Sequence, residues 1–280
     1  MSTYIDTRTL KENGFVALEY PAKLRSGVGE AIRSWKGFCA LSESVKKGLP
    51  YSNGGAGVGY ELKDGSGKSG DQKENFDITT SGRVWMSNNI DSLTGTGSVI
   101  PKFVQRATSL VSLIRPVILD FARQAEEAFG LDCFAKEVAE SEDTFFVRFI
   151  HYFGDRAVGD ETATAHVDQS GFTLHLFESA PGLQCLTYDG SWIDMPVSSG
   201  ETVVIPAMQM QLRSKGDLLA LCHRVVATDE TASVGRYSAV CFVQLGSTPK
   251  YNKDIHGRLQ EKPPGFNYEM RHDAFSLLFK

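Results

Sequence analysis

The sequence predicts a mainly β protein with flanking helices, whose core is an antiparallel sandwich or barrel. From about residue 143, short aromatic and β-branched segments follow one another, with turn residues but no helical segment between them. Before them, apolar residues recur at helical spacing through residues 101–130. Hydrophobic residues make up 41% of the chain and charged residues 22%, which is typical of a globular protein and argues against a disordered chain.

We expect one domain over residues 1–280, divided into three parts. They are a mostly helical N-terminal part (1–142), a β core (143–250) and a C-terminal extension (251–280). Within the first part, residues 51–72 are rich in Gly and Ser, which predicts a loop. A loop of this length can also serve as a lid over a pocket, which is the functional hypothesis for it.

Proline and glycine mark the helices of the N-terminal part. One helical stretch is predicted from Pro21 to about Lys47, because proline is favoured in the first turn of a helix. A long helix is predicted from Pro101 to Gly130, and Pro116 within it should kink or restart it.

The charge and cysteine content exclude several classes of function. The chain carries 29 Lys and Arg against 34 Asp and Glu, without a basic stripe, which argues against a nucleic-acid partner. No apolar run approaches the roughly 20 residues that span a bilayer, and the polar N-terminus contains no secretory signal, so no membrane association is expected. The five cysteines are widely spaced, with no C-x-x-C pair. Reduced thiols in a cytoplasmic protein are therefore predicted.

Three residues of the β-rich half have the chemistry of a metal site. His166 and Asp168 are two residues apart, so on a strand both point to one face. His223 lies in another strand-like segment, and a neighbouring strand could place it opposite them. Two imidazoles and one carboxylate suit a non-haem Fe(II) ion with open coordination positions, and zinc can take the same ligands.

Arg236 and Ser238 form a second pattern of two residues on one strand face. A guanidinium binds a carboxylate through two N–H groups, and a hydroxyl adds one more donor. An isolated Arg-x-Ser is more often a structural ion pair. Its position after the H-x-D and H-R-V segments makes a carboxylate-binding role worth considering.

The order of these motifs resembles the isopenicillin N synthase-like group of Fe(II)- and 2-oxoglutarate-dependent oxygenases. The matching segments are AHVDQSGFTLHLFESAPGLQCLTYDGSWIDMPV, ALCHRVVAT and GRYSAVCF, in that order. The resemblance is strong over residues 144–245 and loose before them. It implies a double-stranded β-helix, or jelly roll, and a dioxygenase that uses O2 to oxidise a C–H bond of a small molecule.

The resemblance also implies roles for individual residues. The Fe(II) ligands would be His166, Asp168 and His223. The distal carboxylate of 2-oxoglutarate would be bound by Arg236 and Ser238.

Two further residues receive roles in the same way. Tyr152 matches a tyrosine that meets the distal carboxylate in many members, although Ile150 stands where the family usually has Asn. Phe242 shares a strand face with Arg236 and is expected to line the substrate pocket. By contrast, His175 is expected to be a packing or surface residue and not a ligand.

Three other functions stay open at this point. An oxidase like isopenicillin N synthase would use the same iron ligands without 2-oxoglutarate, and its Arg-x-Ser pair would bind the substrate. The same three ligands could instead hold zinc for hydrolysis, although no general-base carboxylate at a fixed spacing supports this. A non-catalytic jelly roll could bind only a metal or a small acid. The sequence predicts neither the substrate, nor the choice between hydroxylation, desaturation and ring closure, nor the oligomeric state.

Overall fold

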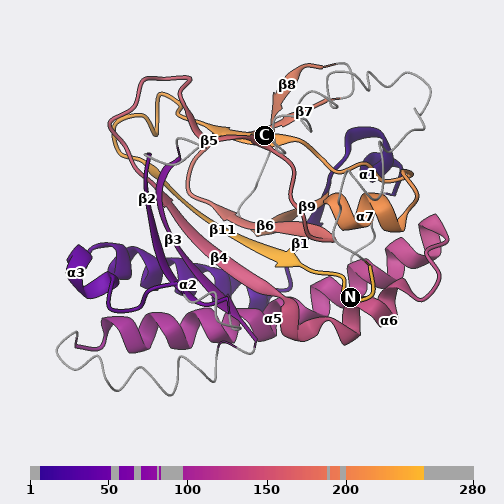
Figure 1. Cartoon of the computed structure of the whole chain (residues 1–280), viewed down its shortest axis with the longest axis horizontal. Coiled ribbons are helices and arrows are strands. Elements are labelled where there is room, and N and C mark those ends of the chain that lie inside the picture. Colours follow the sequence, from indigo (N-terminus) through magenta and orange to yellow (C-terminus); the bar gives the residue numbers. More distant parts are fainter. Residues whose placement is uncertain are drawn as a thin grey trace.

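Two antiparallel sheets and a layer of helices make up the described chain (Figure 1). The computed structural model describes residues 7–51, 57–65, 71–80, 82, 97–187, 190–195 and 200–248. The predicted C-terminal extension over 251–280 lies outside these residues. The arrangement confirms the prediction of a mainly β fold with flanking helices.

The larger sheet has seven strands in the order β1-β9-β6-β11-β4-β3-β2. They are β1 (Val16–Glu19), β2 (Gly59–Asp64), β3 (Gln72–Thr79), β4 (Phe146–Tyr152), β6 (Phe172–Glu178), β9 (Glu201–Pro206) and β11 (Arg236–Val243). The smaller sheet has four strands in the order β5-β10-β7-β8. They are β5 (Glu161–His166), β7 (Leu183–Leu186), β8 (Trp192–Asp194) and β10 (His223–Val226).

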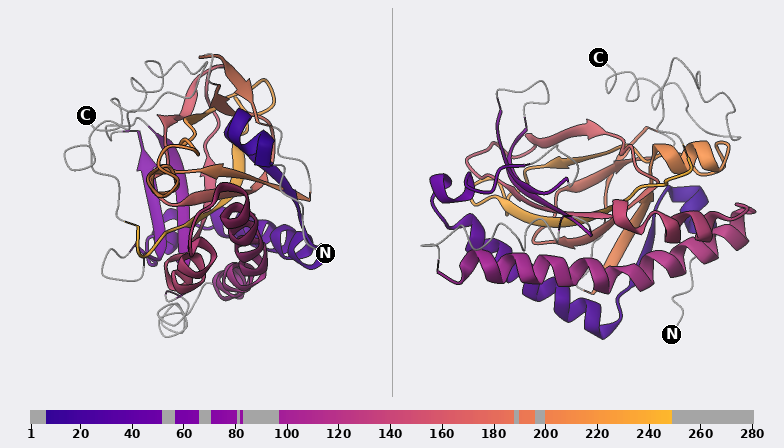
Figure 2. Two further views of the ribbon diagram at one scale, coloured as in Figure 1. Left: turned by 90° about the vertical axis from the view of Figure 1, so that its right-hand side faces the viewer. Right: turned by 60° about the horizontal axis from the view of Figure 1, so that its bottom comes forward.

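Two long helices cover one face of the larger sheet. These are α2 (Ala22–Cys39) and α5 (Val99–Phe129), which lie side by side beneath the strands (Figures 1 and 2). The shorter helices are α1 (Thr7–Asn13), α3 (Glu43–Lys46), α6 (Phe134–Glu140), the 3-10 turn η2 (Glu142–Thr144) and α7 (Met208–Arg213). Among the described residues, no helix is both long and apolar enough to cross a membrane.

Successive side chains of β11 point to opposite faces of the larger sheet and pack in two different hydrophobic cores. Ala239, Cys241 and Val243 pack with the apolar faces of the helices in the main core. On the opposite face, Val240 packs against residues of the smaller sheet, including Val225. The functional residues of β11 therefore face the space between the two sheets.

The N-terminal part is less purely helical than predicted. It supplies β1, β2 and β3 to the larger sheet, and β2 (Gly59–Asp64) lies inside the predicted loop at 51–72. That part of the loop prediction is wrong because residues 59–64 pair along their whole length with β3, which buries Tyr60. The loop residues 52–56 and 66–70 lie outside the described part of the chain, so the lid stays a hypothesis.

The helix boundaries differ from the prediction at three places. The long helix begins at Val99, just before Pro101, and ends as predicted at Gly130, which adopts the left-handed conformation at φ 61°. It does not restart at Pro116, because buried residues on both sides of the proline pack continuously against the core. The earlier helical stretch is interrupted after Cys39 and resumes at Glu43 as the short helix α3.

Candidate metal centre and carboxylate clamp

The smaller sheet brings the three predicted metal ligands together. His166 ends β5 and His223 begins β10, and the two are register partners. Asp168 follows two residues after His166. One ligand atom from each of the three lies within 4.8 Å of the others. The Nε2 atom of His166 is 3.7 Å from Asp168 Oδ1, and that of His223 is 4.0 Å from Asp168 Oδ2.

Both imidazoles are oriented by the backbone. The Nδ1 atom of His166 lies 2.7 Å from the carbonyl oxygen of Thr164, and that of His223 lies 3.1 Å from the carbonyl oxygen of Leu221. Since a carbonyl only accepts, each Nδ1 carries the proton and each Nε2 keeps its lone pair toward Asp168. Metal-binding histidines usually receive this orientation from a hydrogen-bond acceptor at the ring nitrogen that does not bind the metal.

The carboxylate is held as firmly as the imidazoles. Thr173 Oγ1 donates a 2.6 Å hydrogen bond to Asp168 Oδ2. Burial by itself would raise the pKa of Asp168, but His223, His166 and this hydrogen bond outweigh it and lower the pKa below its usual value. Asp168 is therefore an anion at neutral pH.

Burial lowers the pKa of His223 to about 3, and the neighbouring His166 adds to the effect. His223 is therefore neutral at neutral pH, as a metal ligand must be. With two free Nε2 atoms and one carboxylate, the donor set fits Fe(II), and it leaves coordination positions open for other ligands.

An enclosed cavity of about 60 Å³ adjoins these three residues. Its wall includes Phe242 from β11 and Tyr152 from β4. The ring of Phe242 stacks on Phe146, with centroids 4.7 Å apart. The ring of Tyr152 lies 5.5 Å from the Arg236 guanidinium carbon. The structure thus places Tyr152 and Phe242 beside the predicted metal site.

Arg236 and Ser238 do share one face, but both already contact a carboxylate that the sequence interpretation missed. Arg236 Nη2 donates to Glu178 Oε2, and Ser238 Oγ donates to Glu178 Oε1 at 3.0 Å. All three side chains are buried. The predicted carboxylate clamp is therefore occupied by a side chain of the protein itself.

A β-bulge explains why strand alternation could not find Glu178. The register between β11 and β6 shifts between Ala239 and Val240, which leaves Leu176 as an extra residue in β6. Leu176 and Phe177 both pack with the main core, so Glu178 turns to the opposite face. Strict alternation from Thr173 would have put Glu178 against the helices.

The prediction of His175 as a packing or surface residue did not place it beside the metal site. It is buried in the cavity wall, with its ring centroid 5.7 Å from that of His223. Its Nδ1 lies 3.3 Å from Glu178 Oε1, and its Nε2 finds no hydrogen-bond partner among the described residues. Lys73 is a second missed residue of this cavity, and its Nζ pairs with Asp71 at 2.8 Å.

A second triad with metal-binding side chains lies on the other face of the larger sheet. It consists of Cys39, Glu74 and His151. The ammonium group of Lys46 lies 2.5 Å from the Glu74 carboxylate, and burial together with Glu74 raises the pKa of the Cys39 thiol. A cation would meet a fixed positive charge and a protonated thiol there, so this cluster does not fit a metal.

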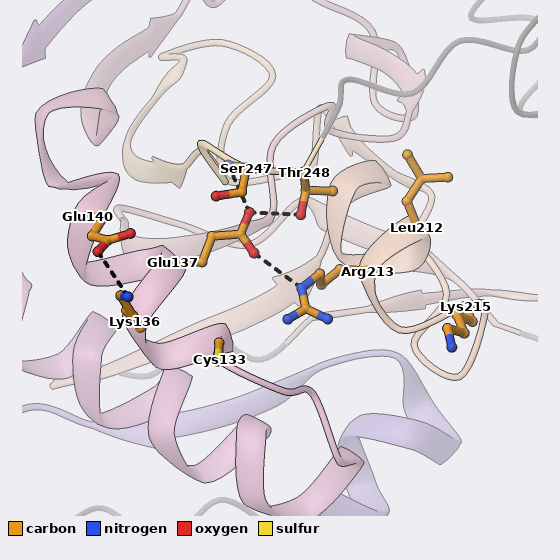
Figure 3. A pocket seen from close by; sticks show the side chains of 9 residues that line it. All are labelled: Cys133, Lys136, Glu137, Glu140, Leu212, Arg213, Lys215, Ser247 and Thr248. Atoms are coloured by element: carbon orange, nitrogen blue, oxygen red, sulfur yellow. Dashed lines mark hydrogen bonds and ion pairs between the residues drawn. The ribbon is translucent and has the colours of Figure 1, made fainter.

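A larger cavity of about 620 Å³ lies between α6 and α7, away from the histidines (Figure 3). At its centre, Glu137 accepts hydrogen bonds from the Ser247 backbone N–H at 3.0 Å, from Thr248 Oγ1 at 2.8 Å and from Arg213 Nε at 3.2 Å. These contacts join α6 and α7 to the end of the described chain. They satisfy the carboxylate, which gives it a structural role.

Comparison with known proteins agrees with this geometry. Residues 141–245 match the 2OG-Fe(II) oxygenase superfamily, and this range contains all seven predicted site residues. This match covers the β core and supports the resemblance of the chain to that superfamily. Solved structures that share the fold support the predicted jelly-roll core, and Fe(II) and 2-oxoglutarate are the cofactors that the description of the matched family names.

The individual proteins that are similar to this chain are distant from it in sequence. The chain is 32% identical over 139 residues to 1-aminocyclopropane-1-carboxylate oxidase homolog 9 of Arabidopsis thaliana, covering 48% of this chain and 36% of that protein. It is 27% identical over 232 residues to a 2-oxoglutarate-dependent dioxygenase of Didymella fabae, covering 74% of this chain and 68% of that protein.

Solved structures of the superfamily share the fold. The structure of dioxygenase for auxin oxidation 1 from Arabidopsis thaliana, in its 2-oxoglutarate complex, superposes with a TM-score of 0.69 at 16% identity. The match covers 88% of each chain. At this identity the likeness concerns the fold and not the substrate.

Proposed function

We propose that this chain is an Fe(II)- and 2-oxoglutarate-dependent dioxygenase that oxidises a C–H bond of a small molecule with O2. The observation that carries the proposal is the set of His166, Asp168 and His223, with both Nε2 atoms free and directed at one carboxylate. These three residues would hold the iron. When bound, iron with 2-oxoglutarate and O2 supplies the oxidising chemistry.

The remaining residues would bind and orient the organic molecules. Arg236 and Ser238 would hold the distal carboxylate of 2-oxoglutarate, with the Tyr152 ring against it. Phe242, stacked on Phe146, would form an apolar wall for the substrate. The small cavity supports this division, because Tyr152, Phe242 and the three predicted iron ligands all line it.

A cytoplasmic location is part of the proposal. The cysteines of the described residues are free thiols, and three of them are buried, which is compatible with a reducing compartment. We also propose that neither nucleic acid nor membrane is a partner, because the chain has no basic excess.

A second candidate is an oxidase like isopenicillin N synthase that does not use 2-oxoglutarate. Glu178 occupies the clamp of Arg236 and Ser238, so the clamp is unavailable to 2-oxoglutarate while Glu178 stays in place. The same contact would block a substrate carboxylate in such an oxidase, so it does not favour one candidate over the other. Zinc hydrolysis has less support. Glu178 is the one carboxylate besides Asp168 among the described residues that line the cavity, and it is held by Arg236.

An anaerobic titration tests the proposal. Fe(II) and then 2-oxoglutarate are added to the metal-free protein, and the visible metal-to-ligand charge-transfer band is recorded. A band that is lost in Arg236→Leu at the same cosubstrate concentration supports the dioxygenase. Iron binding without a band supports the oxidase, and a protein that binds no iron contradicts both.

A further inference from the structure

The carboxylate of Glu178 uses the same groups that the proposed function assigns to 2-oxoglutarate. It accepts from Arg236 Nη2 and from Ser238 Oγ, and His175 Nδ1 lies 3.3 Å from its Oε1. The Glu178 side chain is only 6% exposed. A buried guanidinium without a counter-charge would be strongly unfavourable, so Glu178 stabilises Arg236 while no ligand is bound.

With Glu178 in place, the cavity has a volume of about 60 Å³. The Glu178 carboxylate takes up space beside Arg236 and Ser238, where the distal carboxylate of 2-oxoglutarate would lie. Since Glu178 lines the cavity, moving its side chain would both enlarge the space and free the clamp.

The hydrogen bonding around Arg236 is incomplete with Glu178 in place. Arg236 is 2% exposed, yet its Nε and Nη1 find no hydrogen-bond partner among the described residues. The Nε2 atom of His175, in the same wall, is also without one. Buried polar atoms without a partner are rare in protein cores, so these nitrogens are available to a further ligand.

Glu178 also has a route away from the clamp. It is the last residue of β6, and the segment after it is near solvent, with Ser179 and Pro181 exposed. Rotation of a side chain at this strand end does not require the sheet to open.

We propose that Glu178 is an internal competitor of 2-oxoglutarate: its carboxylate fills the clamp in the cosubstrate-free protein and must be displaced for the distal carboxylate to bind. The inference rests on the proposed function. Its consequence is a lower affinity for the cosubstrate than the clamp alone would provide. Glu178 thereby sets the 2-oxoglutarate concentration at which the site fills.

Glu178→Gln tests the proposal, because it keeps the shape of the side chain and removes the charge. We expect the Kd of the Fe(II)-loaded protein for 2-oxoglutarate to fall about tenfold, followed anaerobically by the charge-transfer band and by calorimetry. Without cosubstrate, the variant should unfold at a lower temperature than the parent, because Arg236 loses its carboxylate. Added 2-oxoglutarate should raise its unfolding temperature more than that of the parent.

Two further variants make the result specific. Glu161→Gln removes the same charge from β5, where Glu161 pairs with Arg224 at 3.0 Å outside the cavity, and it should leave the Kd unchanged. Glu178→Asp keeps the charge but shortens the reach, and it should lower the Kd by less than Glu178→Gln. It also provides the measurement if the glutamine variant does not fold.

The outcomes separate this inference from the proposed function. An equal or higher Kd in Glu178→Gln overturns the competitor role while the dioxygenase stands, and a higher Kd identifies Glu178 as a positioning residue for Arg236. If Glu178→Gln binds 2-oxoglutarate and the parent protein does not, Glu178 closes the clamp completely. If neither protein binds 2-oxoglutarate, the proposed function fails and the inference fails with it.

Discussion

The two faces of the larger sheet each hold a buried glutamate cluster, and the clusters differ in how completely they are hydrogen bonded. On the helix face, Glu74 receives bonds from Lys46 Nζ at 2.5 Å and Tyr60 OH at 2.9 Å, and His151 Nδ1 lies 2.9 Å away. On the opposite face, Glu178 leaves two nitrogens of Arg236 without a partner among the described residues.

The completeness of hydrogen bonding distinguishes a structural cluster from a ligand site better than the residue types do. On the helix face, Cys39, Glu74 and His151 form a triad of metal-binding side chains within 4.8 Å of one another. His166, Asp168 and His223 form the equivalent triad in the cavity that Glu178 lines. Around Glu74 the fixed charges balance, so the cluster stabilises the fold. Around Asp168 and Glu178 spare donors and lone pairs converge on a cavity, which is what a ligand requires.

The largest effect is expected for Asp168→Ala, which should lose iron binding. The variant removes the single carboxylate among the three predicted ligands. Loss of a residue that only hydrogen-bonds to a metal ligand lowers metal affinity by roughly 10–100-fold, and loss of Asp168 itself should lower the iron affinity by more than this. Iron stoichiometry after anaerobic loading measures it. Glu74→Gln is the matched control and should bind iron as the parent does; equal iron content in Asp168→Ala and the parent would contradict the metal assignment.

The second prediction concerns stability. Glu74→Gln should lower the free energy of unfolding by about 3–5 kcal/mol at pH 7, because it leaves Lys46 buried beside a neutral partner. Urea unfolding of the variant and the parent measures the difference. Glu43→Gln, which breaks an exposed pair with Lys47, should cost about 0.5 kcal/mol or less. A similar cost for the two variants would show that the Glu74 cluster is not structural.

The same difference should depend on pH. Burial alone would raise the pKa of Glu74, but the hydrogen bonds from His151, Lys46 and Tyr60 outweigh it and lower the pKa from 4.5 to about 2. A carboxylate with a lowered folded-state pKa contributes its full stability above the unfolded value. The gap between parent and Glu74→Gln should therefore be constant from pH 7 to about 5 and shrink as the pH falls from 4.5 toward 2.

The third prediction tests whether Arg236 binds 2-oxoglutarate. Arg236→Leu should weaken 2-oxoglutarate binding by about 1.5–3 kcal/mol, because a charge-assisted hydrogen-bond donor is lost, while iron still binds. Arg224→Leu removes an arginine from the smaller sheet outside the cavity and should leave cosubstrate binding unchanged. An unaltered Kd in Arg236→Leu would make Arg236 purely structural.

The smallest expected effect is that of Thr173→Val. The variant keeps the volume of the side chain but removes the 2.6 Å hydrogen bond to Asp168, so iron affinity should fall by roughly 10–100-fold. A chelator competition assay measures this. Thr162→Val on β5 loses only a 3.3 Å hydrogen bond to the carbonyl oxygen of Val225, and it should retain the parent affinity. If both variants behave alike, Thr173 does not support the ligand.

Much of the site was predictable because its residues obey strand alternation. Arg236, Ser238 and Phe242 share one face of β11 because they are spaced by multiples of two. Asp168 lies two residues beyond the end of β5, so the spacing from His166 pointed to the right residue although that residue is not in a strand. The long helix was predictable from its apolar stripe and from Gly130. The strand β2 was not, because a Gly-rich segment carries little pattern of its own and becomes a strand only by pairing with β3.

The sequence by itself determined the kind of site: the two imidazoles, the carboxylate and the arginine, in an order that indicated iron and a small acid. Only the tertiary structure decided that Arg236 has a partner. Glu178 faces the cavity because the bulge at Leu176 reverses the alternation of β6, and a bulge depends on the register with β11, far along the chain. His175 was missed for a related reason, since alternation says which residues share a face but not which face meets the other sheet.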